Sequence, residues 1–467
     1  MSGHAKGPTQ AYGHCKGMMT CQTKGPKAVA NEATAHQIII IVGGGAGGLE
    51  LVTRLGDQLG RGAQAHITLI DVSPSHLWKP LLHEVAAGSL DSYAERLEYL
   101  AQGHWHHFDF RLGRMDGLDR KKKTVSVAPT LDENGAEVIP RRSFRYDTLI
   151  LAVGSCGNDF GVPGVREYCI MLDTPEQARQ FHQRHINACL AANTQSAPVA
   201  PAQLTVGIVG AGATGVELAA ELHDTTRQLS VYGLEKIDPD KNLRLLLVES
   251  SDRILAGLPP RLSAAAAERL HELGVHIHTG ERVVEVRKDG MLTASGKFFA
   301  ASMMVWSAGI KAPDFLATLG LETNRINQLV VRRTLQTSDD NIFAFGDCAA
   351  CPMPDGTGIV PPRAQAAHQQ ASMLEKSMCR RLRGKPLPHY VYRDYGSLVA
   401  LGRFSTVGNL MGGLVGGSLM VEGQVARFVY WSLHKMHEVA LHGYIKTALA
   451  TLASLINSPN KVTIKLH

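Results

Sequence analysis

The same nucleotide-binding pattern occurs twice in this chain, and no other feature limits its fold as strongly. In the first copy, the β-branched run Ile38–Val42 predicts a buried strand that leads into a glycine turn and a helical stretch over Leu49–Leu59. A second strand, Ala65–Ile70, ends on Asp71, at about the expected 20 residues beyond the turn. The glycines of the turn are Gly43, Gly45 and Gly48. This spacing lets backbone N–H groups approach a pyrophosphate and places a carboxylate near ribose hydroxyls.

The second copy repeats every part of the first. Leu204–Val209 predicts a strand, Val216–Leu229 a helix, and Leu243–Val248 a strand that ends on Glu249. The turn glycines are Gly210, Gly212 and Gly215. A loop rich in glycine and aspartate lengthens this copy, so its acidic residue lies further from the turn than the usual ~20 residues. Two dinucleotide cradles in one chain predict an enzyme that passes electrons between a flavin and a nicotinamide.

Two further strands indicate how the cradles are connected. The apolar run Leu149–Ser155 can close the first sheet before the second cradle begins. Asn341–Phe345 is another apolar run and leads into Gly346 and Asp347. It fits a strand that returns to the first sheet and offers a carboxylate to a ribityl chain. The predicted fold class is therefore α/β, with two doubly wound Rossmann-like domains, the second inserted into the first.

Charge and cysteine content restrict the partners. The chain has 48 Lys and Arg against 42 Asp and Glu, a net charge of +6, which favours phosphates or a lipid surface. Basic runs interleaved with aromatic residues do not occur, so we expect no nucleic acid partner. The 8 cysteines show no spacing typical of a disulfide-stapled domain and favour a reducing cytoplasm.

Two groups of cysteines leave alternatives open. Cys15 and Cys21 lie in the first 36 residues, which we predict to be a flexible tail without the apolar run of a signal peptide. With His4 and His14 they could bind a metal ion, but no core surrounds them and we predict no metal site. Cys348 and Cys351 form a Cys-x-x-Cys pair directly after Asp347. Redox or copper chemistry is one interpretation, and packing is the one we favour.

Several segments together resemble the type II NADH dehydrogenases, the single-chain respiratory NADH:quinone oxidoreductases, and most closely their proteobacterial branch. The resemblance covers about Gln37 to His467. The segments that carry it are Ile41–Glu50, His76–Val85, Gly210–Glu217, Trp306–Ile310, Gly346–Ala349 and Ala364–Gln369. The glycine segments are shared across a superfamily, whereas Pro80-Leu81-Leu82 and the Ala364–Gln369 segment are far more specific.

The resemblance implies a domain organisation and a reaction. FAD would bind non-covalently to the first cradle and NADH would be the substrate at the second. A hydride would pass from NADH to FAD, and two electrons from the flavin to a membrane quinone, without proton pumping. The expected limits are residues 1–36 for the tail, 37–160 and 306–384 for the two parts of the FAD-binding domain, 161–305 for the NADH-binding domain, and 385–467 for a C-terminal membrane-anchoring region.

The resemblance also assigns site residues. Those implied to contact the flavin are Gly43, Gly45, Gly48, Asp71, Lys79, Ala152, Gly154, Asp347, Gln365 and Ala366. Those implied to contact the nicotinamide nucleotide are Gly210, Gly212, Gly215, Glu217, Glu249, Ala308 and Gly309. Glu217 would lie near the nicotinamide amide, although an acidic residue at a helix N-terminus is also favoured by the helix dipole alone.

Three residues are implied to be catalytic. Glu221 follows Glu217 by one helical turn and could face the flavin ring or the quinone cavity. Gln365 and His368 lie in the segment that lines the quinone cavity in the family. We expect them to form hydrogen bonds with quinone oxygens and to relay protons to the quinol.

The C-terminal part predicts a membrane surface contact. Phe404–Val421 is uncharged, but its many glycines favour strands and turns over a membrane-spanning helix. Leu441–Asn457 carries apolar residues at helical spacing beside a cationic edge, as helices that lie in a membrane interface do. We therefore expect a peripheral protein on the cytoplasmic face of the bacterial inner membrane, bound to anionic lipid. The alternative is a helix packed on the protein's own core or on a second subunit of a homodimer.

Three other functions fit parts of the sequence. A sulfide:quinone oxidoreductase would share the fold, with Cys156 and Cys348 or Cys351 handling sulfur, but it has no use for a second cradle with Glu249. A flavin-based redox sensor would keep both cradles and lack the Ala364–Gln369 segment. A soluble NADH-dependent reductase of the ferredoxin type would need no lipid-facing end.

Overall fold

The structure, a computed structural model, describes residues 37–200, 203–401, 406–412 and 417–422, together with Gly3 and single positions between 432 and 452. Apart from Gly3, the predicted N-terminal tail with Cys15 and Cys21 therefore lies outside the described residues. Most of the predicted amphipathic stretch Leu441–Asn457 lies outside them as well. Among the described residues, no helix combines the length and the apolar character needed to cross a bilayer.

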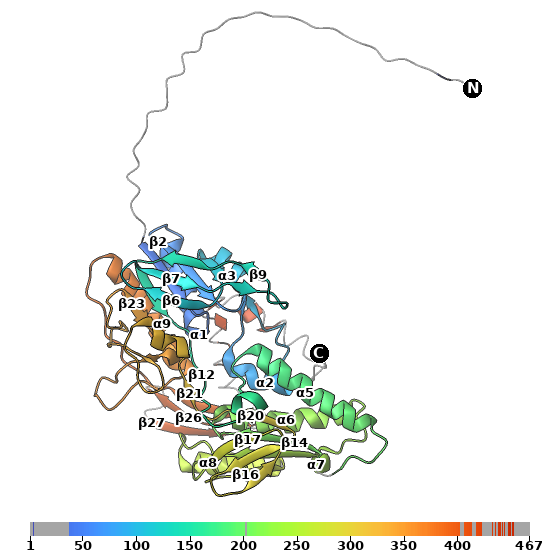
Figure 1. The fold of residues 1–467 in the computed structure, drawn as a ribbon. Helices are drawn as coiled ribbons and strands as arrows, with labels where there is room; N and C mark the ends of the chain where they lie inside the picture. The colour runs from blue at the N-terminus through green and yellow to red at the C-terminus, as the bar shows by residue number, and fades with distance from the viewer. Residues whose placement is uncertain are drawn as a thin grey trace, which may run out of the picture. The chain divides into compact units, whose positions relative to one another are not determined.

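The first sheet has five parallel strands in the order β23-β11-β1-β2-β5. They are β23 (Ile342–Ala344), β11 (Thr148–Leu151), β1 (Gln37–Val42), β2 (Ala65–Asp71) and β5 (Asp109–Leu112). The last strand in sequence, β23, pairs with β11, so the chain returns to this sheet after the second cradle. In Figure 1, β23 and α9 (Ala364–Leu382), coloured orange, accordingly lie beside the blue N-terminal elements.

The second sheet repeats this architecture. Its five parallel strands follow the order β13-β20-β14-β15-β16. They are β13 (Cys169–Ile170), β20 (Met303–Trp306), β14 (Leu204–Val209), β15 (Leu243–Val248) and β16 (Val275–His278). In both sheets the strand before the glycine turn is central and pairs with the strand that ends in the acidic residue. The prediction of two doubly wound domains, the second inserted in the first, is confirmed, whereas the exact domain limits stay a prediction.

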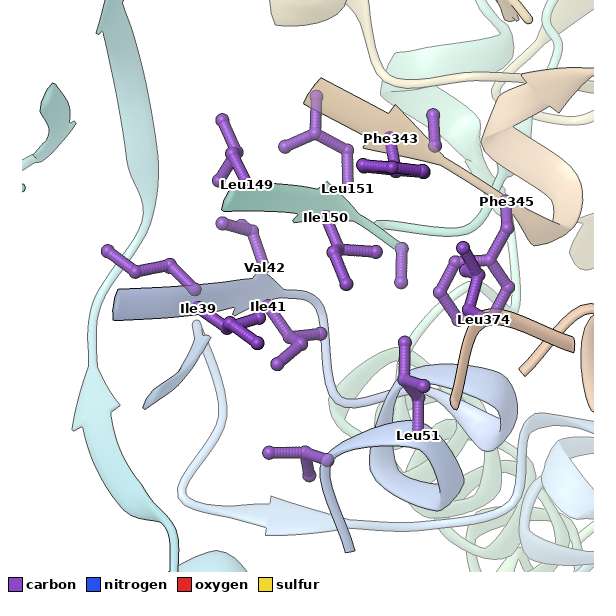
Figure 2. Packing of buried hydrophobic residues seen from close by; sticks show 14 of the residues in the cluster. Ile39, Ile41, Val42, Leu51, Leu149, Ile150, Leu151, Phe343, Phe345 and Leu374 are labelled. Atoms are coloured by element: carbon purple, nitrogen blue, oxygen red, sulfur yellow. The ribbon is translucent and has the colours of Figure 1, made fainter. Parts of the chain in front are cut away.

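The apolar runs form central strands because both of their faces are covered. Ile39, Ile41 and Leu149 are at most 1% exposed, as parallel strands between helical layers require. Figure 2 shows the side chains of β1, β11 and β23 meeting Leu51 of α1 (Ala46–Leu55) and Leu374 of α9 in one buried cluster. A short π-helical turn, Gly56–Gly60, follows α1 where the sequence predicted a continuous helix to Leu59.

The remaining helices connect or cover the two sheets. They are α2 (Leu82–Ala87), α3 (Tyr99–His106), α4 (Val165–Tyr168), α5 (Pro175–Thr194), α6 (Ala213–Val231), α7 (Pro239–Asn242) and α8 (Pro260–Glu272). Helix α5 begins with a reciprocal cap, in which Thr174 accepts from the backbone of Gln177 and the Gln177 side chain accepts from the backbone of Thr174. Helix α6 begins at the second glycine turn and α1 at the first.

Antiparallel strands complete the fold. Two three-stranded sheets that the sequence patterns did not predict are formed by β6 (Met115–Asp119), β7 (Thr124–Val127) and β10 (Arg142–Arg145), and by β17 (Val283–Arg287), β18 (Gly290–Thr293) and β19 (Phe298–Ala300). A third consists of β25 (Gly396–Ala400), β26 (Thr406–Gly412) and β27 (Gly417–Glu422). The glycine-rich stretch Phe404–Val421 thus contains strands, as its composition predicted.

Short strand pairs join distant segments. They are β3 (Ser75–His76) with β4 (Leu97–Glu98), β8 (Thr130–Leu131) with β9 (Glu137–Ile139), β12 (Cys156–Gly157) with β21 (Ile310–Lys311), and β22 (Leu329–Val330) with β24 (Ala349–Ala350). The β12–β21 pair matters most for the site. There the chain leaves the first sheet and comes back from the second, and the two passages are held together.

Candidate active site

The first cradle is closed by backbone contacts around Gly43. This residue has φ +103°, and a Cβ there would collide with the carbonyl of Ala152, so only glycine fits the turn. The Asp71 carboxylate at the end of β2 accepts from the Gly44 N–H at 2.6 Å and from the Ser73 N–H at 2.8 Å. Burial raises the pKa of Asp71, against the lowering effect of these backbone hydrogen bonds. The acidic residue therefore fixes the turn with part of its acceptor capacity, and further lone pairs stay available for ribose hydroxyls.

The second cradle has the same geometry. Gly210 has φ +97°, and a Cβ there would lie 2.7 Å from the Ala308 backbone. Glu249 accepts from the Ala211 N–H at 2.7 Å and from the Ser251 N–H at 2.8 Å. Although burial raises the pKa of Glu249, its hydrogen bonds outweigh that effect and the net shift is downward. The carboxylate is thus held in its charged form, which makes it a stronger acceptor for ribose hydroxyls.

Both helices that follow the glycine turns begin without a side-chain cap. The N-cap residues are Gly45 for α1 and Gly212 for α6, and neither first turn contains an acidic residue. A Cβ at either glycine would meet nothing within 4 Å, so open space lies beside the first N–H groups of each helix. Uncapped N–H groups and the positive end of the helix dipole attract a phosphate. The residues at both cradles therefore fit a dinucleotide.

Asp347 lies at the carboxyl end of the first sheet, directly after β23. Its carboxylate accepts from the Ser155 hydroxyl at 2.8 Å, and Ser155 follows β11. Lys79 also reaches this edge, because its Nζ donates to the Ser155 carbonyl at 2.9 Å and to Asp173 at 3.2 Å. Gly154 lies next to Ser155 with φ +68°, and a Cβ there would meet nothing within 4 Å. These predicted flavin contacts are therefore brought together along one open edge beside the first cradle.

Helix α9 begins against the same cradle. A Cβ on Gly47 would lie 3.1 Å from the Ala367 Cβ and 2.7 Å from the Phe345 ring, so α1 and α9 approach closely at this point. Ala366 is 2% exposed in this packing. The Gln365 amide donates to Asp394 at 3.1 Å and to the Gly396 carbonyl at 3.0 Å. Its side chain thus connects α9 to the start of β25, a structural task that its motif alone did not suggest.

His368 lies one turn further along α9 and contacts α1 through a hydrogen bond. Its Nδ1 bonds to Oε2 of Glu50, a carboxylate that is only 2% exposed. Arg54 holds the other oxygen, Oε1, at 2.7 Å. Burial lowers the pKa of His76 to about 4, and the neighbouring His368 lowers it further. Since His76 bonds to the Gly44 carbonyl at 2.9 Å, these contacts place His368 close to the first cradle.

A second ionisable cluster lies where α2 meets α6. Glu217, one turn into α6, has one oxygen 3.1 Å from the Ala400 N–H of β25 and the other 3.5 Å from His83 Nδ1 on α2. Burial and the neighbouring carboxylates Glu84 and Glu221 raise the pKa of Glu217 to about 8. Burial, with Glu221 next, likewise raises the pKa of Glu84 to about 8. Burial lowers the pKa of His83 to about 4, so this cluster holds protons on its carboxyl groups at neutral pH.

The remaining predicted contacts lie where the chain passes between the sheets. Gly309 has φ +67°, and a Cβ there would collide with the ring of Phe160. The Gly309 carbonyl accepts from the Asn158 N–H at 3.2 Å, and Trp306 Nε1 donates to the Asn158 carbonyl at 2.8 Å. Ala308 packs on Gly210 in the second cradle. The Ala308 and Gly309 segment is therefore held firmly beside the second cradle.

The Cys-x-x-Cys pair is part of the core. Cys348 and Cys351 are both fully buried and both are free thiols. Burial raises the pKa of Cys348 to about 12 and that of Cys351 to about 11, so both thiols stay protonated and unreactive at neutral pH. Within the described part of the chain, no group of three or more His, Cys, Asp or Glu side chains is arranged to hold a metal ion.

Several residues at the site were missed by the sequence reasoning, namely Glu50, His76, His83, Glu84 and Tyr99. Tyr99 donates to the Gly44 carbonyl at 2.7 Å, and a Cβ on Gly44 would collide with its ring. Glu50 carried one usable signal, since it is a lone acid between the apolar Leu49 and Leu51 in a helix that had to be buried. The partners of the others come from distant elements and leave no local pattern.

Comparison with known proteins gives three relevant matches. Residues 37–371 match the model of the pyridine nucleotide-disulphide oxidoreductase family. The chain is 42% identical to a type II NADH:quinone oxidoreductase of Haemophilus influenzae, over 92% of this chain and 99% of that protein. Its fold resembles that of NDH2 from Plasmodium falciparum, solved in complex with NADH, with TM-score 0.75 and 17% identity over 92% of this chain and 100% of that one. A sulfide:quinone oxidoreductase of Aquifex aeolicus has a similar fold, with TM-score 0.68 and 18% identity over 90% and 95% of the two chains.

Proposed function

Because the chain belongs to the type II NADH:quinone oxidoreductases within the pyridine nucleotide-disulphide oxidoreductase family, we propose that its two cradles carry electrons from NADH to a membrane quinone. The balanced reaction takes NADH, one proton and a quinone to NAD⁺ and a quinol. Proton pumping has no part in it. The observation that carries the proposal is the pair of cradles with matching turn geometry, one of which borders the start of α9 with His368.

The first cradle would hold FAD, bound non-covalently. Bound flavin would supply the hydride-accepting and electron-donating chemistry between the two substrates. The open N-terminus of α1 would receive the pyrophosphate, and Asp71 the adenosine ribose. Asp347 and Lys79, which both contact Ser155, would bind the ribityl side. Denaturing the protein and finding the flavin in the protein-free filtrate would check the non-covalent attachment.

The second cradle would hold NADH. Glu249 would accept from both ribose hydroxyls, and its charge would repel the 2′-phosphate of NADPH. Arg253 could offset that charge, but its guanidinium is already bonded to the Ala256 carbonyl at 3.0 Å and to Asp252 at 3.4 Å. Glu217 would orient the nicotinamide end, and Glu221 would belong to the same proton-holding cluster.

The quinone would bind beside the start of α9. His368 would form a hydrogen bond with a quinone oxygen and deliver a proton to it. Gln365 would hold the Asp394–Gly396 loop that borders the site. The buried His83 and Glu217 would exclude water at the α2–α6 contact, and the carboxyl groups of Glu84 and Glu217 would keep protons there.

Two rival functions are disfavoured. A sulfide oxidation centre would need reactive cysteines, whereas Cys348 is buried and its pKa is raised to about 12. The fold likeness to a sulfide:quinone oxidoreductase does not discriminate, because it comes with only 18% identity. A sensor has no need for a quinone site, and the 42% identity extends over 92% of the chain, including the α9 segment.

The membrane contact would be made by the C-terminal region, on the cytoplasmic face and with anionic lipids. Positions 447–449 and 451–452 are helical, and Leu449 and Leu452 are 63% and 56% exposed there. Leu441, which the sequence placed on the same apolar stripe, is instead buried in the first core cluster. The stripe would therefore divide its side chains between the protein and the lipid.

Rapid mixing separates the two half-reactions and tests the proposal. Mixing the flavin-loaded protein with NADH should bleach the flavin, and a soluble quinone should then restore its colour. In His368→Ala, bleaching should keep its parental rate and reoxidation should slow roughly tenfold to a hundredfold, the cost of one lost hydrogen bond to a developing charge. A parental protein that is bleached by NADH and is not reoxidised by quinone would contradict the proposed function.

A further inference from the structure

A network of polar contacts centred on the buried Glu50 crosses from α1 to α9 beside the proposed quinone site. Glu50 uses Oε1 for Arg54 at 2.7 Å and Oε2 for Nδ1 of His368. The Ser372 hydroxyl also reaches Oε1, at 3.5 Å. Arg54 in turn bonds to Glu375 at 3.2 Å. Glu50 is therefore a carboxylate whose two oxygens are engaged separately, one by the network and one by the imidazole.

This arrangement selects one form of the His368 ring. A charged carboxylate can only accept, so the nitrogen that bonds to it must carry a proton. The proton of the neutral ring is consequently on Nδ1, and Nε2 is the acceptor nitrogen. When Nε2 takes up a second proton, the imidazolium lies against the negative charge of Glu50. In carboxylate–histidine pairs of hydrolases, the carboxylate likewise accepts from Nδ1–H and leaves Nε2 for proton transfer.

We propose that Glu50 is the positioning residue for His368 in quinone reduction, an inference that rests on the function proposed above. His368 would take a proton from water at Nε2 and deliver it to an oxygen of the reduced quinone. The ring would then return to the neutral form with its proton on Nδ1. Each turnover would move one proton through Nε2. The two electrons and the other proton of the quinol would come from the reduced flavin, and Glu50 would neither gain nor lose a proton.

The geometry explains why the carboxylate of Glu50 is kept at this point. Glu50 is 2% exposed, and an acidic side chain so deeply buried costs stability unless it is paired. Arg54 alone would satisfy one oxygen. The other oxygen is aimed at a half-buried histidine at the start of α9, 26% exposed, rather than at a second fixed cation.

Kinetics of Glu50→Gln test the inference. The amide can donate to Nδ1 and so stabilise the wrong tautomer. Reoxidation of the NADH-reduced flavin by a soluble quinone should slow roughly tenfold to a hundredfold, the usual effect of losing an orienting partner, while bleaching by NADH keeps its rate. Glu50→Asp, which keeps the carboxylate, should recover part of the loss. The matched control is Glu375→Gln, which removes the outer partner of Arg54 and should leave reoxidation unchanged.

Two further measurements separate positioning from packing. In a His368→Ala background, Glu50→Gln should slow reoxidation no further, because its effect acts through the ring. In the flavin-loaded parental protein with ¹⁵N-labelled histidine, the His368 signal, identified by its loss in His368→Gln, should show the proton on Nδ1.

The opposite results overturn the inference. They are a signal showing the proton on Nε2, additive losses in the double variant, or an unchanged reoxidation rate in Glu50→Gln when the parental protein reduces quinone. If the parental protein itself does not reduce quinone, the proposed function fails, and the tautomer measurement still decides whether Glu50 positions the ring.

Discussion

At the scale of single residues, the acid that ends each cradle has a double task. Asp71 and Glu249 each accept from the N–H of the residue between the first two turn glycines, at 2.6 and 2.7 Å. Each carboxylate is therefore fixed before any ribose binds, which lowers the entropy that binding must offset. The choice between NADH and NADPH then depends on the negative charge that the carboxylate presents to the ribose.

Glu249→Gln should weaken the discrimination between the two nicotinamide cofactors. The amide keeps the size of the side chain and removes the charge that repels a 2′-phosphate, so the ratio of kcat/KM for NADH over NADPH should fall roughly tenfold. Steady-state kinetics with a soluble quinone measures this ratio. Arg253→Gln is the control, because it should not raise the efficiency with NADPH. Equal efficiencies with both cofactors in the parental protein would show that Glu249 does not select NADH.

Glu217 predicts a pH dependence of stability. Its pKa, raised to about 8, lies above the value of 4.5 expected in an unfolded chain, so between these two values the folded protein binds more protons. The free energy of unfolding should therefore fall as the pH rises from about 5 to 8, by about 1 kcal/mol per pH unit from this group. Glu217→Gln imitates the protonated carboxyl and should lack this decline. Its Tm relative to the parental protein should rise steadily from pH 6 to pH 9.

The control for this prediction is Glu268→Gln, which removes a charge from the exposed surface of α8. Circular dichroism of the flavin-loaded proteins at each pH gives the Tm values. A Tm difference between Glu217→Gln and the parental protein that does not change with pH would mean that Glu217 is charged throughout the range.

At the scale of elements, two glycines at the start of α1 serve different purposes, one beside open space and the other at a contact between helices. Gly45 faces open space, whereas Gly47 faces Phe345 and Ala367 across the α1–α9 contact. Gly47→Ala should destabilise the protein by about 1–3 kcal/mol through overpacking, with or without excess flavin. Gly45→Ala should instead weaken flavin binding, and excess FAD should restore its Tm. Thermal unfolding at several FAD concentrations distinguishes the two. A Tm deficit of Gly45→Ala that excess FAD leaves in place would contradict the assignment of this turn to FAD.

Local patterns predicted the elements well and the contacts between elements poorly. The strands around both turns end where the apolar runs end, because a buried parallel strand needs apolar residues on both faces. The pairing of Glu50 with His368 depends on α1 crossing α9, which no spacing along the chain encodes. The same holds for His83 and Glu217, which meet only because α2 packs on α6. The sequence motif around Gln365 and His368 indicated the start of α9 as a candidate site. It did not show that Gln365 holds the Asp394–Gly396 loop.

At the scale of the whole molecule, the C-terminal region has both a protein-facing and a solvent-facing part. Leu441 is 2% exposed, so removing everything from this residue onward would also remove part of the core. Replacing Leu449 and Leu452 by Gln is the cleaner change, since both are exposed. Two leucine side chains are worth roughly 3 kcal/mol on transfer to an apolar environment. The double variant should therefore bind vesicles containing anionic lipid at least tenfold more weakly, with NADH oxidation by a soluble quinone unchanged.

Sedimentation with such vesicles at physiological salt measures the binding. The matched control replaces Leu131 and Val138 by Gln, because these apolar residues are similarly exposed on the β8–β9 hairpin, 57% and 64%. Equal losses of binding in the two double variants would mean that no particular apolar surface meets the lipid. Unchanged binding in the Leu449 and Leu452 variant would exclude these side chains as the anchor.

The two cradles differ in length but not in the position of their acids. Glu249 reaches the Ala211 N–H although α7 and its loops separate α6 from β15, because the ladder between β14 and β15 aligns Val209 with Val248. The position of Glu249 is thus determined by the hydrogen-bonded ladder between β14 and β15, and not by the number of residues between the turn and the acid. It follows that the exposed turn at Gly233 can take added residues without moving the acid. A fluorescent reporter inserted there would be attached to the proposed NADH-binding domain and should leave nucleotide binding by the second cradle unchanged.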